Sequence, residues 1–293
     1  MLTTHTTDGP DGRTLQYYTL DAADAGAESR IPVIWLHGSP NVGEPPAPLY
    51  DAAVGHGIRW IGYDRPGYGK STENPGRDVA SAAKDVEAVA DALGLERFAV
   101  MGHSGGGAHA FACAALLPDR VGAVVSVSGL APYPRHGEEL TASLSWFDGF
   151  HPGGATQMRA ALAGRDALER AARDSKYDPE MFTPEDTEML AGPWRWFNHV
   201  VELGTANGMG GFIDDNLAAM RPWGFDIGDV GVPTLIMHGT EDRVVPASHA
   251  RWLGRHIPGA QLRLREGAGH LSVMSGAEDA LSWIAQTIAA QER

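Results

Sequence analysis

The segment Phe98-Ala99-Val100-Met101-Gly102-His103-Ser104-Gly105-Gly106, followed by the alanine-rich residues 108–117, decides the fold. Its first four residues form the apolar run of a buried strand, and residues 108–117 have the composition of a helix. The Gly-x-Ser-x-Gly pattern between them predicts a tight, strained turn, because side chains at the glycine positions would collide with neighbouring backbone. Such a turn pushes Ser104 out of the sheet and points the N-terminus of the next helix at it, where backbone N–H groups favour negative charge.

The alternative interpretation of this turn is a glycine-rich loop that holds an inert serine. The strand before it and the helix after it argue against that interpretation.

Outward from this segment, short apolar runs alternate with longer amphipathic ones. Residues 77–93 carry Val and Ala at helical spacing, and Gly94 supplies a stop signal. The strand-like runs are residues 13–20, 32–36, 59–63, 98–101, 121–127, 234–237 and 261–264. This alternation predicts an α/β fold, in which helices cover both faces of a parallel sheet.

The alternation is interrupted once, over residues 131–228, where prolines separate helical segments and no convincing strand is found. We therefore predict a core domain of residues 1–130 and 229–293 and a helical insertion of residues 131–228. The insertion is rich in Trp, Phe and Met, which either line an apolar substrate pocket or form its own core. The candidate pocket residues are Trp146, Trp194 and Trp223 of the insertion, with His37 and His103 of the core.

Composition limits the possible functions. The chain has 293 residues, 43% of them hydrophobic and 20% charged, as in ordinary globular proteins. Its formal net charge of −14 would repel nucleic acid and anionic lipid surfaces. The polar first residues lack the pattern of a secretory signal, so we expect a cytoplasmic protein. We also expect it to be a monomer or a homodimer. The single cysteine, Cys113, is expected to be a packed core residue rather than a functional thiol.

A serine hydroxyl is a poor nucleophile, so catalysis by Ser104 requires a base and a group that orients the base. The best base is His270, because it lies on a loop of small residues after the last strand-like run. The best acid is Asp242, which follows the run 234–237 and so lies at the ligand side of the sheet. The alternative for His270 is a solvated loop histidine, and the alternative for Asp242 is a helix-capping or turn carboxylate. Glu241 is the rival acid, although it is better explained as a solvated turn residue.

Acyl chemistry also needs an oxyanion hole. His37-Gly38-Ser39-Pro40 follows the run 32–36, and we predict the backbone N–H groups of Ser39 and Gly105 as donors. The alternative is a turn that only packs the loop. No histidine spacing suggests a metal site, and no metal or organic cofactor is expected.

Together these motifs resemble the α/β-hydrolase superfamily, whose triad runs in the chain order serine, aspartate, histidine. The carriers are residues 37–40, 64–71, 102–106, 239–242 and 269–270. The resemblance implies an eight-stranded, mostly parallel sheet with a helical cap inserted after strand six, the place of residues 131–228. It also implies that Asp64, Arg65 and Ser71 form a structural turn. Epoxide hydrolases and haloalkane dehalogenases share the His-Gly-x-Pro element but use an aspartate where this chain has Ser104.

The resulting prediction is a serine hydrolase that cleaves an ester of a small, apolar substrate through an acyl-enzyme. Four alternatives stay open: an aminopeptidase similar to proline iminopeptidases, a lactone hydrolase, an acyl-transfer enzyme of a biosynthetic pathway, and a non-catalytic ligand-binding member. The loop His37-Gly38-Ser39-Pro40 differs from the His-Gly-Gly-Pro-Gly usual in iminopeptidases, which disfavours the first of these.

Overall fold

The computed structural model of the protein describes residues 1–20, 30–134 and 144–291. Eight strands form one sheet in the order β1-β2-β4-β3-β5-β6-β7-β8. The two strands β1 and β2 pair antiparallel, β2 pairs antiparallel with β4, and all remaining neighbours are parallel. The strands are β1 (Leu2–Asp8), β2 (Thr14–Leu20), β3 (Ile31–Leu36), β4 (Ile58–Tyr63), β5 (Phe98–His103), β6 (Val121–Val127), β7 (Thr234–Gly239) and β8 (Gln261–Arg265). The predicted α/β class is thus confirmed.

Strand β1 has no counterpart in the sequence-based prediction. Its residues LTTHTTD lie at the sheet edge and bury no side chain fully. A strand of this kind is missed because it lacks the apolar run by which a buried strand is recognised in a sequence.

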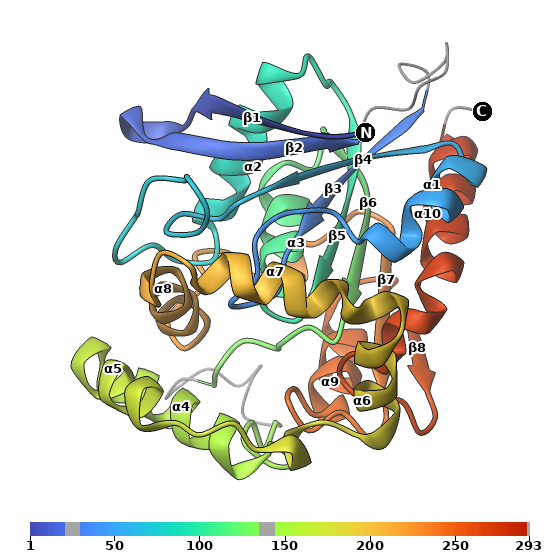
Figure 1. Ribbon diagram of the computed structural model, residues 1–293. Helices are drawn as coiled ribbons and strands as arrows, with labels where there is room; N and C mark the ends of the chain where they lie inside the picture. The colour runs from blue at the N-terminus through green and yellow to red at the C-terminus, as the bar shows by residue number, and fades with distance from the viewer. Residues whose placement is uncertain (21–29, 135–143, 292–293) are drawn as a thin grey trace.

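Helices cover both faces of the sheet (Figure 1). One core contains side chains of α2 (Ser81–Ala92), α3 (Gly105–Leu116) and α9 (Ala247–His256). The other contains side chains of α1 (Tyr50–Gly55) and α10 (Ala277–Gln291). Successive strand residues alternate between the two cores; Ile34 belongs to the first and Trp35 to the second. Both faces of the inner strands are therefore buried, as expected for a parallel sheet, whereas the edge strands β1 and β8 are more exposed.

Between β6 and β7 the described residues contain helices and no strand. They are α4 (Pro152–Ala163), α5 (Arg165–Asp174), α6 (Pro184–Ala191), α7 (Trp196–Thr205) and α8 (Gly210–Ala219), called the helical insert below. In Figure 1 α4 and α5 of the insert lie below the sheet, and α7 crosses in front of the lower ends of the strands. The division into a core domain and a cap at residues 131 and 228 stays a prediction.

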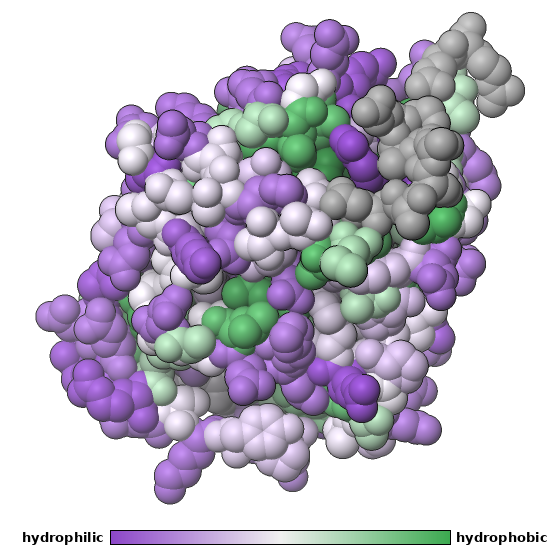
Figure 2. Space-filling model, turned by 45° about the horizontal axis from the view of Figure 1, so that its top comes forward, coloured by the Kyte–Doolittle hydropathy of each residue, from purple (hydrophilic) through white to green (hydrophobic). Residues whose placement is uncertain are grey.

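The surface carries hydrophilic residues between small apolar patches on the face seen in Figure 2. Within the described residues, no helix has the length and apolar character required to cross a bilayer.

His249 of α9 joins the core to the segment after β6. Its Nδ1 accepts a hydrogen bond from the Ala131 N–H (3.1 Å), and its Nε2 donates to the Trp146 carbonyl (2.9 Å). This pair of contacts fits only the neutral ring. Burial lowers the pKa of His249 from its ordinary 6.5 to about 4.

We expect the free energy of unfolding to fall between pH 7 and pH 4. The unfolded chain takes up a proton at His249 near pH 6.5 while the folded chain does not, so this stabilisation is present above pH 6.5 and is lost as the pH falls through about 4. His249 contributes on the order of 3 kcal/mol to this loss. Urea unfolding at pH 7, 6, 5 and 4 measures it. His249→Gln should reduce the dependence by this amount, because burial also lowers the pKa of His37, His103 and His109, which keep the remainder. His199→Gln, on the exposed face of α7, should leave the dependence unchanged; equal slopes for all three proteins would contradict the assignment.

Candidate active site

Ser104 occupies a sharp turn between β5 and α3. Its backbone has φ 55° and ψ −126°, a conformation that is strained for a residue with a side chain. A Cβ at Gly106 would lie 1.9 Å from the Leu36 carbonyl oxygen, and one at Gly102 would lie 2.1 Å from the Gly106 oxygen. Only glycine allows this close approach. The glycines of the motif are therefore explained by the turn that presents Ser104.

His270 and Asp242 meet at the carboxyl-terminal end of the sheet, on the loops that follow β8 and β7. The His270 Nδ1 lies 2.8 Å from the Asp242 Oδ2. The other carboxylate oxygen, Oδ1, accepts hydrogen bonds from the backbone N–H groups of Val244 (2.9 Å) and Val245 (2.8 Å). Glu241 is exposed. The structure thus brings His270 to Asp242 and not to the rival acid.

His238, the last residue but one of β7, is a neighbour of this pair that the sequence did not single out. Its Nε2 lies 2.7 Å from the Val245 carbonyl oxygen and 3.3 Å from the Asp242 Oδ2. Burial alone would raise the pKa of Asp242. The charge interaction with His270 and the hydrogen bonds from His238 and His270 outweigh burial and hold that pKa well below its ordinary value. Asp242 is therefore ionised at neutral pH.

His103 precedes Ser104 and supports the loop of His270. Its Nε2 donates to the His270 carbonyl oxygen (3.0 Å). Burial, and then the nearby charge of His270, lowers the pKa of His103 to about 3. A neutral His103 ring adds no positive charge beside His270.

The loop after β3 lies against the serine turn. A Cβ at Gly38 would lie 3.3 Å from the Ser104 Cβ, and one at Gly105 would lie 3.2 Å from the Ser39 Oγ. Ser39, Gly105 and Ser104 are thus neighbours, as an oxyanion hole requires. His37 lies behind this loop, where its Nδ1 donates to the Gly38 carbonyl (2.7 Å) and its Nε2 accepts from the Arg65 N–H (3.0 Å).

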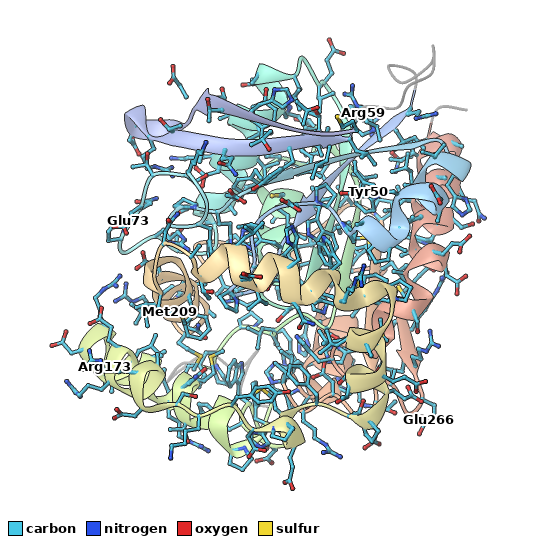
Figure 3. The ribbon with its side chains drawn as sticks, viewed as in Figure 1. Tyr50, Arg59, Glu73, Arg173, Met209 and Glu266 are labelled. Atoms are coloured by element: carbon cyan, nitrogen blue, oxygen red, sulfur yellow. The ribbon has the colours of Figure 1, made fainter. Side chains whose placement is uncertain are left out.

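A cavity of about 750 Å³ opens onto Ser104, Gly105, Ser39 and His270. It lies between the sheet edge and the helical insert, and Met209, labelled in Figure 3 at the start of α8, is one of its lining residues. Its wall is mainly apolar, with contributions from Leu130, Phe150, Met158, Phe182, Phe197 and Phe212. A second cavity, of about 800 Å³, opens beside His151 and Arg243 but contains none of the three candidate catalytic residues.

The predicted pocket residues need correction. His103 lines the cavity, but His37, Trp146, Trp194 and Trp223 are absent from its described wall. The Trp146 indole stacks on Phe150 and donates to the Ala131 carbonyl (3.0 Å), Trp194 stacks on Phe197, and Trp223 donates to the Ala219 carbonyl (3.1 Å). Trp146 and Trp223 belong to the first of the two hydrophobic cores and Trp194 to the second, and phenylalanine and methionine line the cavity instead.

A buried ion network joins the insert to the loop after β3. Asp215 of α8 accepts hydrogen bonds from Arg65 (2.7 Å), Arg77 (2.6 Å), the Tyr68 hydroxyl (2.8 Å) and the Ser39 hydroxyl. Burial would raise the pKa of Asp215, but the two arginines hold it well below its ordinary value. Arg65, expected only as part of a structural turn, also donates to the His37 carbonyl.

We expect Asp215→Ala to lower the free energy of unfolding by about 3–5 kcal/mol, because it leaves Arg65 buried with only neutral partners. Urea unfolding at pH 7 measures the effect. Asp166→Ala, at an exposed position on α5, is the matched control and should change stability by less than about 0.5 kcal/mol. A similar small change for Asp215→Ala would show that the network does not stabilise the fold.

Residues 31–277 match the family model described as the alpha/beta hydrolase fold. The chain belongs to this family. It is 30% identical over 263 residues to a non-heme chloroperoxidase of Streptomyces lividans, covering 84% of this chain and 87% of the relative. It is 28% identical to a 2-hydroxy-6-oxononadienedioate/2-hydroxy-6-oxononatrienedioate hydrolase of Cupriavidus pinatubonensis, covering 84% and 81%.

Solved structures show the same fold. The enol-lactonase from Burkholderia xenovorans superposes with a TM-score of 0.69 at 20% identity, covering 97% of this chain and all of the other. Relatives of this α/β hydrolase thus include hydrolases, which supports an enzymatic hydrolase function. In the described parts of the chain, no three His, Cys, Asp or Glu side chains are arranged to hold a metal ion.

Proposed function

We propose that this α/β hydrolase is a serine esterase acting on small apolar esters. The observation that carries the proposal is the strained turn of Ser104, which opens into the same cavity as His270, whose ring is bound to an ionised Asp242. A serine in place of an aspartate at this turn favours an acyl-enzyme over an alkyl-enzyme intermediate.

In the proposed mechanism the Ser104 Oγ attacks the ester carbon while the His270 Nε2 takes its proton. Asp242 holds the His270 Nδ1–H and stabilises the imidazolium that forms. The N–H groups of Ser39 and Gly105 stabilise the oxyanion, and loss of one such donor typically costs about 3 kcal/mol of barrier. His270 then protonates the leaving alcohol, and water activated by His270 releases the acid.

The residues that line the cavity favour a substrate with an uncharged acyl group. Lys176, an exposed residue, is the only lysine or arginine among the described residues that line the cavity. Arg65 is paired with Asp215, so it cannot neutralise a substrate carboxylate without losing that partner. This argues against dicarboxylate substrates of the kind named for the Cupriavidus relative, although its similarity makes carbon–carbon bond hydrolysis the second candidate.

A matched pair of esters tests the proposal. We expect hydrolysis of p-nitrophenyl butyrate with a burst of p-nitrophenol, and much slower hydrolysis of the p-nitrophenyl monoester of succinate, which adds a carboxylate. A fluorophosphonate should label Ser104, as located by peptide mass spectrometry. The esterase proposal fails if esters of all chain lengths are inert and Ser104 is unlabelled. A preference for the succinate ester would contradict the apolar substrate class.

A further inference from the structure

Asp186 lies in the first turn of α6, within the helical insert, and is almost fully buried. It forms a capping box with Thr183: the Thr183 Oγ1 accepts from the Asp186 N–H, and the Asp186 Oδ2 accepts from the Thr183 N–H, each at 3.1 Å. A capping box explains an acidic residue at this position. It does not explain the other contacts of the same carboxylate.

The Asp186 carboxylate also binds the loop that carries His270. Its Oδ2 accepts from the His270 N–H (3.2 Å), and its Oδ1 accepts from the N–H groups of Leu271 (2.9 Å) and Ser272 (2.6 Å). One side chain of the insert thus satisfies three consecutive backbone donors, 84 to 86 residues away in sequence. Without it these buried N–H groups would lose their acceptor.

The contact between Asp186 and the His270 loop requires glycine at position 269. A Cβ on Gly269 would lie 2.1 Å from the Asp186 Oδ2 and 2.7 Å from the Thr183 Oγ1. Any larger residue would push α6 away from the loop. The glycine before His270 therefore serves the approach of the insert.

We propose that Asp186 is a positioning residue for His270, which rests on the proposed function of His270 as the base. Asp242 then holds the ring of His270, His103 its carbonyl group, and Asp186 its N–H. The helical insert thereby takes part in catalysis even for a substrate too small to fill the cavity. A displacement of about 1 Å of a reacting group can cost about 100-fold in rate.

The test compares Asp186→Asn with Glu185→Gln, its exposed neighbour on α6. For p-nitrophenyl acetate we expect Asp186→Asn to lower kcat by about 10- to 100-fold with KM nearly unchanged, because the loss concerns the transition state. Amide hydrogen exchange of Leu271 and Ser272, measured by NMR, should become faster. Glu185→Gln should match the wild type in both measurements.

A second variant separates positioning from helix stability. Thr183→Ala removes the other half of the capping box but keeps the carboxylate, so it should destabilise the insert while leaving kcat and the exchange of Leu271 and Ser272 close to wild type. The proposal is overturned if Asp186→Asn leaves that exchange slow, or if Thr183→Ala lowers kcat as much as Asp186→Asn does. The exchange measurement needs no substrate. It therefore tests whether Asp186 holds the His270 loop even if the wild type proves inactive on esters.

Discussion

Ser104→Ala is expected to reduce kcat for p-nitrophenyl butyrate by on the order of 10⁶-fold, because no acyl-enzyme can form without the hydroxyl. The fold should persist. Alanine keeps the Cβ, so the strain of the positive φ at residue 104 is unchanged, and the glycines that make room for the turn remain. Steady-state kinetics with circular dichroism at matched concentrations measures both quantities.

The control for this variant is Ser282→Ala on α10, which removes a serine hydroxyl outside the described cavity wall. It should retain wild-type kcat. If Ser104→Ala hydrolyses the ester at the rate of Ser282→Ala, another group performs the hydrolysis. A residual rate above that of water is compatible with the mechanism, since the oxyanion donors and the cavity still bind the substrate.

The sequence reveals the central part of the fold because local signals agree there. An apolar run, a glycine turn and a helix meet at Ser104. The runs before Asp242 and His270 form the parallel neighbours β7, which is buried, and β8, which is mostly exposed, and their carboxyl ends lie at the same end of the sheet. Parallel pairing then brings residues 104, 242 and 270 to that end. The roles of these residues remain predictions that rest on their placement.

Contacts made by the insert could not be predicted in this way. Asp186 carries a local signal only for its capping box, and nothing in the sequence indicates its contact with Leu271. Asp215 likewise meets Arg65, 150 residues away, through packing of α8 on the core. The tryptophans show the same limit, because an aromatic residue gives the same sequence signal whether it lines a pocket or fills a core. Burial decides between them, and Trp146 and Trp223 are core residues.

Asp242→Asn should remove most of the activity through the tautomer of His270. The Asp242 Oδ1 accepts from two backbone N–H groups, so an asparagine will keep its oxygen on that side. Its NH₂ group then replaces Oδ2 and faces the His270 Nδ1. A donor in this place requires Nδ1 to be unprotonated, which puts the ring proton on Nε2. A protonated Nε2 cannot take the proton of Ser104.

We therefore expect kcat of Asp242→Asn to fall by about 10⁴-fold, with KM changed far less. Fluorophosphonate labelling of Ser104 should slow in parallel, because labelling needs the same proton transfer. Glu241→Gln is the matched control: it makes the same acid-to-amide change one residue away, on an exposed side chain. If Glu241→Gln were the inactive variant and Asp242→Asn the active one, the bond between His270 and Asp242 would have no part in the reaction.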